Sequence, residues 1–255
     1  MNNVFIQNRH SQKLAVVVEE QEGQKGLAFV MHGQGGFKEQ PHVRTFIEAF
    51  MEKGFTVVSF DAANTIGESG GNMEYASITS YYEDLEDVIH WAQSQEWYQE
   101  PFTLAGHSLG GICTALYAEH HPEKVLGLAP ISTVVSGTLS WETHPKEELD
   151  EWKRTGWRVS ESKSKPGVIK KLKWKTMEDR LKYDLLEKAD KLTMPVLLIV
   201  GDGDTTTPLA HQKLLFDALP GKKELHVIPG AAHTFRDPKH LEAIQQHFLK
   251  WIDAL

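Results

Sequence analysis

The chain has 255 residues, a net charge of −8 and 40% hydrophobic residues. This composition is typical of a globular protein and excludes a basic nucleic-acid footprint, and no apolar run reaches the ~18 residues of a membrane span. The N-terminus has no signal-peptide pattern, and the single Cys113 cannot form an intrachain disulfide, so we expect a cytoplasmic protein without nucleic-acid or membrane partners.

Strand-like and helix-like runs alternate along the chain. The strand-like runs cover residues 3–8, 13–19, 26–31, 55–60, 102–105, 125–129, 195–200 and 224–229. The helix-like runs cover residues 40–53, 77–97, 112–118 and 237–253. This alternation predicts an α/β fold with a mostly parallel central sheet that is flanked by helices on both faces.

An early turn follows the strand-like run at 26–31. It begins with His32 and Gly33 and continues through Gln34. A His-Gly turn after an early strand is where some serine hydrolases place an oxyanion donor. We expect the backbone N–H of Gln34 to be one donor, and His32 to orient the backbone of the turn.

The most informative segment is 106–110, with the sequence Gly-His-Ser-Leu-Gly, between a strand-like and a helix-like run. A Gly-x-Ser-x-Gly turn in that context is a nucleophile elbow, in which a sharp turn lifts Ser108 above the sheet edge. The N–H of Leu109 would be the second oxyanion donor. A second match at 67–71 places Ser69 outside a strand-turn-helix context, so we interpret that segment as a loop.

A serine hydroxyl needs a histidine base and an acid that orients the base. Loops that follow the two last strand-like runs supply both, in the order acid then base. Asp202 and Asp204 are the candidate acids, and His233 is the candidate base. Most of the 13 histidines are expected to be structural or solvated.

These landmarks resemble the α/β-hydrolase family of serine hydrolases, over nearly the whole chain. Within that family the chain looks most like small lid-bearing carboxylesterases and cinnamoyl (feruloyl) esterases. The family pattern Gly-x-x-Asp-x-x-x-Pro falls on Asp204, which implies a Ser108–Asp204–His233 triad and a turn role for Asp202. The resemblance also implies a lid after the sixth strand.

Residues 133–191 interrupt the alternation and are far longer than a strand-to-helix connection requires. They contain 14 Lys/Arg against 11 Asp/Glu, and four of the seven tryptophans. We therefore divide the chain into a core, 1–132 and 192–255, and a lid insertion, 133–191. Trp141, Trp157 and Trp174 are candidate substrate-binding residues, although tryptophans in a small insertion can also simply cover apolar surface.

The predicted function is hydrolysis of carboxylic esters through an acyl-enzyme, with a small-molecule ester as substrate. A feruloyl or cinnamoyl esterase is the alternative, because lid tryptophans would stack on a phenolic ring. A monoacylglycerol lipase, a serine peptidase or amidase, and a non-catalytic binding protein of the same fold remain open. The sequence is compatible with a monomer or a homodimer.

No cofactor and no metal are expected. The histidine pairs at 120–121 and at 240 and 247 lack acidic or histidine partners at ligand spacing, and no His-Glu-x-x-His segment occurs. The glycines at 33–36 do not form a complete Gly-x-Gly-x-x-Gly dinucleotide loop.

Overall fold

The computed structural model describes residues 2–255, with side chains from residue 3 onward. Its centre is an eight-stranded sheet in the order β1-β2-β4-β3-β5-β6-β9-β10. The strands are β1 (Asn2–Gln7), β2 (Lys13–Glu19), β3 (Gly26–Met31), β4 (Phe55–Asp61), β5 (Phe102–His107), β6 (Val125–Ile131), β9 (Val196–Gly201) and β10 (Lys223–Ile228). β2 runs antiparallel to both β1 and β4, and the other neighbouring strands are parallel. The predicted mostly parallel sheet is therefore confirmed.

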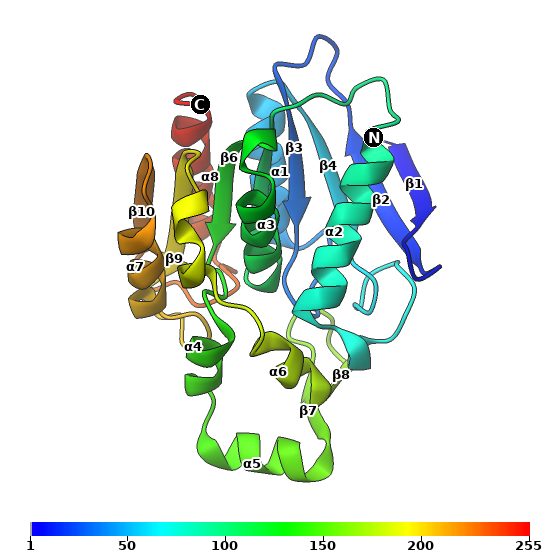
Figure 1. Cartoon of the computed structure of the whole chain (residues 1–255), viewed down its shortest axis with the longest axis vertical. Helices are drawn as coiled ribbons and strands as arrows, with labels where there is room; N and C mark the ends of the chain where they lie inside the picture. The colour runs from blue at the N-terminus through cyan, green and yellow to red at the C-terminus, as the bar shows by residue number, and fades with distance from the viewer. Residues whose placement is uncertain (1) are drawn as a thin grey trace.

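Helices cover both faces of the sheet (Figure 1). One face carries α1 (Pro41–Glu52) and α8 (Pro238–Ile252), and the other carries α2 (Ile78–Ala92), α3 (Leu109–His120) and α7 (Leu209–Ala218). Each face has its own apolar core, which explains why β3, β5 and β9 are buried along their whole length. Strands buried on both faces read as continuous apolar runs, as these do.

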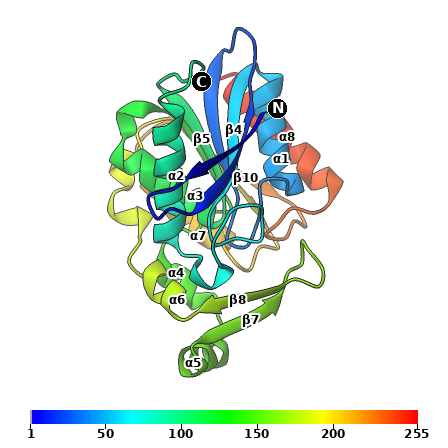
Figure 2. The ribbon, with the colours of Figure 1, turned by 90° about the vertical axis from the view of Figure 1, so that its right-hand side faces the viewer.

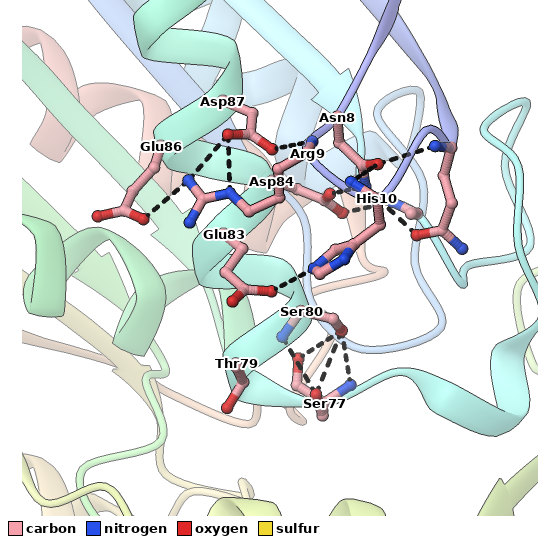
Figure 3. A network of polar contacts seen from close by, with 12 residues as sticks. Asn8, Arg9, His10, Ser77, Thr79, Ser80, Glu83, Asp84, Glu86 and Asp87 are labelled. Carbon is pink, nitrogen blue, oxygen red and sulfur yellow. Dashed lines mark hydrogen bonds and ion pairs between the residues drawn. The ribbon is translucent and has the colours of Figure 1, made fainter.

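The antiparallel edge of the sheet is tied to α2 by polar contacts (Figure 3). Arg9 in the β1–β2 turn binds Asp87 of α2 through its backbone N–H at 2.7 Å and through its guanidinium at 2.8 Å. Asp84 accepts a hydrogen bond from the Asn8 amide at 2.6 Å and another from the backbone N–H of Ala63 at 2.7 Å. These contacts hold the hairpin and the loop after β4 against the same helix.

The segment between β6 and β9 forms a separate layer at one end of the sheet. It contains α4 (Gly137–Glu142), α5 (Lys146–Thr155), β7 (Trp157–Glu161), β8 (Ile169–Lys173), α6 (Lys175–Arg180) and two short 3-10 turns, η3 (Leu185–Glu187) and η4 (Ala189–Lys191). Two further 3-10 turns, η1 (Met73–Tyr75) and η2 (Pro122–Lys124), lie in the core. Figure 2 shows α5 and the β7–β8 hairpin beyond the end of the sheet. We call residues 133–191 the insertion; its division from the core remains our interpretation.

The helices differ from those that span a bilayer. Among the described residues, no helix combines the length and the apolar character needed to cross a membrane.

Candidate active site

Ser108 lies at the turn between β5 and α3, with a strained backbone. Its φ is +56° and its ψ is −114°, a combination that costs of order 1–3 kcal/mol and persists where the surroundings enforce it. The flanking glycines make the turn possible. A Cβ on Gly106 would lie 2.3 Å from the carbonyl oxygen of Gly110, and a Cβ on Gly110 would lie 2.4 Å from that of His32. The turn therefore has the geometry of a nucleophile elbow.

The loops after β9 and β10 bring Asp204 and His233 to this serine. His233 Nε2 lies 2.9 Å from Ser108 Oγ, and His233 Nδ1 lies 2.8 Å from Asp204 Oδ2. The parallel strands β5, β9 and β10, with β6 between β5 and β9, have their carboxyl ends at one edge of the sheet. This explains how residues 125 positions apart in sequence come into hydrogen-bond range. All three residues of the predicted triad therefore converge.

Asp204 is buried and fully hydrogen-bonded. Its Oδ1 accepts hydrogen bonds from the backbone N–H groups of Thr206 and Thr207, at 2.8 and 2.9 Å. Burial alone would raise the pKa of this carboxyl, but the hydrogen bond and charge interaction with His233 and the hydrogen bonds from Thr207 outweigh it and lower the pKa to about 2. Asp204 is therefore a carboxylate at neutral pH and can stabilise a charged imidazole.

Thr207 is a positioning residue that the sequence reasoning missed. Its hydroxyl lies 2.9 Å from Asp204 Oδ2, 2.9 Å from the carbonyl oxygen of Ser132, and 3.2 Å from His233 Nδ1. It therefore links the acid loop to the end of β6. The only signal in the sequence is the Asp-x-x-Thr spacing, which is common in turns and has no specific link to catalysis.

His107, next to the nucleophile, fixes the backbone of the base. Its Nε2 donates a hydrogen bond to the carbonyl oxygen of His233 at 2.8 Å. Burial, followed by the neighbouring His42 and His233, lowers the pKa of His107 well below its usual value. His107 is therefore a neutral donor that holds the His233 loop.

The candidate oxyanion donors lie close to Ser108: Leu109 is the next residue, and Gln34 lines both cavities at Ser108. Within residues 2–255, the backbone N–H groups of Gln34 and Leu109 donate no hydrogen bond to another residue. His32 holds the turn that carries Gln34, since its Nδ1 donates to Gly33 O at 2.7 Å and its Nε2 accepts from the Ala62 N–H at 3.1 Å. Two free donors beside a serine are the arrangement that stabilises a developing oxyanion.

The competing residues have structural partners instead. Asp202 accepts a hydrogen bond from the backbone N–H of Gly230 at 2.6 Å, as expected of a turn residue. The Ser69 hydroxyl accepts from the Ala15 N–H at 2.8 Å and donates to the Asp61 carbonyl oxygen at 2.5 Å. Neither side chain is brought to Ser108.

Two cavities meet at Ser108 and His233. We call the larger one, of about 700 Å³, the outer cavity, and the smaller one, of about 380 Å³, the inner cavity. The core supplies the Gln34 turn and the Asp204 and His233 loops to both, and the insertion supplies Arg158, Ser160 and Lys170 to both. A substrate can therefore extend in two directions from the serine.

The three candidate tryptophans do not line either cavity. The Trp141 and Trp174 ring centroids are 5.6 Å apart, and Trp174 lies 5.6 Å from buried Trp152. Trp157 lies beneath the ammonium groups of Lys171 and Lys173. For Trp141 and Trp174 this placement favours the second interpretation, in which tryptophans cover apolar surface, because both pack against the apolar cluster that the insertion shares with the core.

Arg180 joins the insertion to the oxyanion turn, and sequence reasoning missed it. Its Nη2 donates to the side-chain oxygen of Gln34 at 2.8 Å, and the Gln34 side-chain nitrogen donates to the carbonyl oxygen of Ala76 at 2.7 Å. The basic excess of the insertion was the only hint, and it does not single out one arginine. No cluster of three or more His, Cys, Asp or Glu side chains suited to a metal ion occurs in the described part of the chain.

Known proteins that resemble this chain show its family. The family model Hydrolase_4, described as serine aminopeptidase, S33, matches residues 23–238. The chain belongs to the Hydrolase_4 family of α/β-hydrolases. The resemblance inferred from the motifs is thereby confirmed, and the protein is a serine-hydrolase-type member of that fold.

Among its relatives, an uncharacterised 31.7 kDa protein of Escherichia coli is 27% identical over 238 residues, which cover 81% of this chain and 82% of that protein. A thermostable monoacylglycerol lipase of Bacillus sp. (strain H-257) is 23% identical over 228 residues, or 84% of this chain and 88% of the lipase. Est1E of Butyrivibrio proteoclasticus, solved with ferulic acid bound, superposes with a TM-score of 0.83 at 20% identity, over 98% of each chain. Mouse α/β-hydrolase domain-containing protein 10 has a TM-score of 0.81 at 18% identity, over 100% and 98% of the two chains respectively. At these identities the structural likeness shows the fold.

Proposed function

We propose that this protein is a carboxylic ester hydrolase that works through an acyl-enzyme on Ser108. The observation that carries the proposal is the continuous hydrogen-bonded chain from Asp204 through His233 to Ser108, next to two unoccupied backbone donors. Nucleophile, base, orienting acid and oxyanion donors are the four parts that acyl transfer from an ester requires.

In the first half of the reaction, His233 Nε2 takes the proton of the Ser108 hydroxyl as the oxygen attacks the ester carbonyl. The N–H groups of Gln34 and Leu109 bind the resulting oxyanion, and each such donor contributes about 3 kcal/mol to transition-state stabilisation. Asp204 holds Nδ1 of the imidazole and stabilises its protonated form. His233 then gives the proton to the departing alcohol, which leaves an ester between the acyl group and Ser108.

In the second half, water takes the place of the alcohol. His233 accepts a proton from the water as its oxygen attacks the acyl-enzyme, and the same two N–H groups bind the second oxyanion. Protonation of Ser108 Oγ by His233 releases the carboxylic acid and restores the free enzyme. Residues from the core carry every step.

The cavity lining favours short or polar esters over long acyl chains. Most side chains around the outer cavity are polar or charged, and a monoacylglycerol needs a long apolar surface. The structural likeness to Est1E supports a phenolic ester as the alternative substrate. Against this alternative, the tryptophans expected to stack on a phenolic ring line neither cavity. A substrate panel of 4-nitrophenyl butyrate, methyl ferulate, a long monoacylglycerol and an aminoacyl amide separates these alternatives.

Replacement of the nucleophile tests the proposal. Ser108→Ala should lower kcat for 4-nitrophenyl butyrate by about 10⁴-fold or more, since the remaining triad members contribute little without it. Ser69→Ala is the matched control, because Ser69 lies in the other Gly-x-Ser-x-Gly segment, and it should keep its activity per folded molecule. Near-normal turnover by Ser108→Ala would reject the assignment.

A further inference from the structure

The wall of the two cavities carries more positive than negative side chains. The cationic residues are Arg158, Lys163, Lys170, Arg180 and Arg236, and all but Arg236 belong to the insertion. The anionic residues are Glu148, Glu161 and Asp237. Hydrolysis of a neutral ester does not require this charge, and two of the cations, Arg180 and Lys170, have no ion-pair partner among the described residues.

Arg180 is a buried guanidinium without a carboxylate partner. Only 8% of the residue is exposed. Its Nη1 donates to the Ser140 hydroxyl at 2.9 Å and its Nη2 to the Gln34 amide oxygen at 2.8 Å, both of which are neutral, and its Nε has no partner. Burial, and then the neighbouring Arg158, lowers the pKa of Arg180 to about 10, while the charge of Asp179, which forms no ion pair with Arg180, partly opposes this shift. Arg180 is therefore still charged at neutral pH. A buried charge of this kind is costly unless something neutralises it.

Lys170 is a second cation without a partner at the same place. Within residues 2–255 its Nζ forms no hydrogen bond or ion pair, and the residue lines both cavities. Its stem lies against the oxyanion turn, since a Cβ on Gly35 would be 3.0 Å from Lys170 Cδ. Burial, then Arg158 and Lys163, lowers the pKa of Lys170. Arg180 and Lys170 thus flank the turn that carries Gln34.

The three carboxylates of the lining have other partners. Glu148 binds Arg158 at 2.6 Å and His144 at 3.4 Å. Glu161 accepts the N–H of Gly167 at 2.9 Å. Asp237 caps α8 by accepting the N–H of Lys239 at 2.9 Å. None of them neutralises Arg180 or Lys170.

We propose that the ester cleaved at Ser108 carries a second, anionic group, a carboxylate, that binds at Arg180 and Lys170 in the inner cavity. This inference rests on the proposed ester hydrolysis and adds the substrate class. A carboxylate there gains charge-assisted hydrogen bonds in a site sheltered from water, where such bonds are stronger than on the surface. The physiological substrate is then a monoester of a dicarboxylic acid, or an ester whose alcohol bears a carboxylate.

Two matched ester pairs test the inference and locate the charge. On the acyl side, mono-4-nitrophenyl adipate is compared with 4-nitrophenyl 6-methylheptanoate, in which an isopropyl group replaces the carboxylate. On the alcohol side, 4-(butanoyloxy)phenylacetate is compared with its primary amide. We expect kcat/KM to favour the anionic member of one pair by about tenfold or more, in line with one charge-assisted contact.

Variants assign that preference to the two cations. Lys170→Gln and Arg180→Gln should each reduce the anionic-to-neutral ratio of kcat/KM about tenfold. The matched control is Lys171→Gln, because Lys171 is the next residue of β8, is exposed, and lies over the Trp157 ring instead of lining a cavity. It should leave the ratio and both rates unchanged. Lys170→Gln removes no contact with Gln34, so it remains informative if the Arg180 variant folds poorly.

The outcomes separate this inference from the proposed function. If the protein hydrolyses the neutral esters and kcat/KM is no higher for the anionic ester of either pair, the inference is wrong and the ester hydrolase assignment stands. An anionic preference that survives in both Lys170→Gln and Arg180→Gln would also overturn it. Absence of hydrolysis of every ester would reject the proposed function itself.

Discussion

The core wall and the insertion wall of the cavity at Ser108 are built in different ways. On the core side, Asp204, Thr207 and His233 lie in the loops after β9 and β10, and their side chains form hydrogen bonds with one another. On the insertion wall, no carboxylate of the described residues lies within ion-pair distance of Arg180 or Lys170. On our two proposals this difference is a division of labour, in which the sheet edge supplies the chemistry and the insertion selects the substrate.

The largest loss of activity is expected from a substitution in the core. Asp204→Asn should lower kcat by about 10⁴-fold, because the amide favours the wrong imidazole tautomer and cannot stabilise its charged form. Steady-state kinetics with 4-nitrophenyl butyrate measures this. Asp202→Asn is the matched control from the same loop, since Asp202 caps Gly230 and does not contact His233. If Asp202→Asn lost as much activity as Asp204→Asn, the assignment of Asp204 as the triad acid would be wrong.

A smaller effect is expected from the core of the insertion. Trp152 is 1% exposed, and its indole N–H donates to the carbonyl oxygen of Leu172 at 3.2 Å. Trp152→Ala should destabilise the insertion by about 3–5 kcal/mol. Hydrogen exchange should then speed up within 133–191 while β3, β5 and β9 stay protected. We expect kcat/KM for 4-nitrophenyl butyrate to change by less than about tenfold, because no triad residue lies in the insertion.

The half-buried Trp157 provides the control for that experiment, because it packs beneath lysine side chains instead of the other tryptophans. Trp157→Ala should affect exchange much less. If Trp152→Ala lost protection from hydrogen exchange in the insertion and in the central strands together, the two regions would unfold as one unit. The proposed division of labour would then be wrong.

The comparison also explains what the sequence could predict. The sequence could predict Ser108 as the nucleophile, because the sharp turn needs glycines at fixed spacing and the flanking strand and helix have recognisable hydrophobic patterns. The prediction of Asp204 as the acid needed the family resemblance, because the local sequence offers both Asp202 and Asp204 and the family pattern falls on Asp204. The order of strands then brought His233 to the same edge.

The sequence could not predict which residues of the insertion face the cavities. The tryptophan count predicted substrate contact, but three of these rings pack on one another in the insertion, because a small layer must first bury its own apolar surface. Arg180 and Thr207 act through contacts over long sequence distances, such as the 146 residues between Arg180 and Gln34. Composition shows that such cations exist but not which of them face the cavity.

The most direct test of the central claim is covalent labelling of the protein with a fluorophosphonate, followed by peptide mapping. The account predicts a single adduct on Ser108, which disappears in Ser108→Ala and slows strongly in Asp204→Asn. An adduct on another serine, or equal labelling of Ser108→Ala, would contradict it.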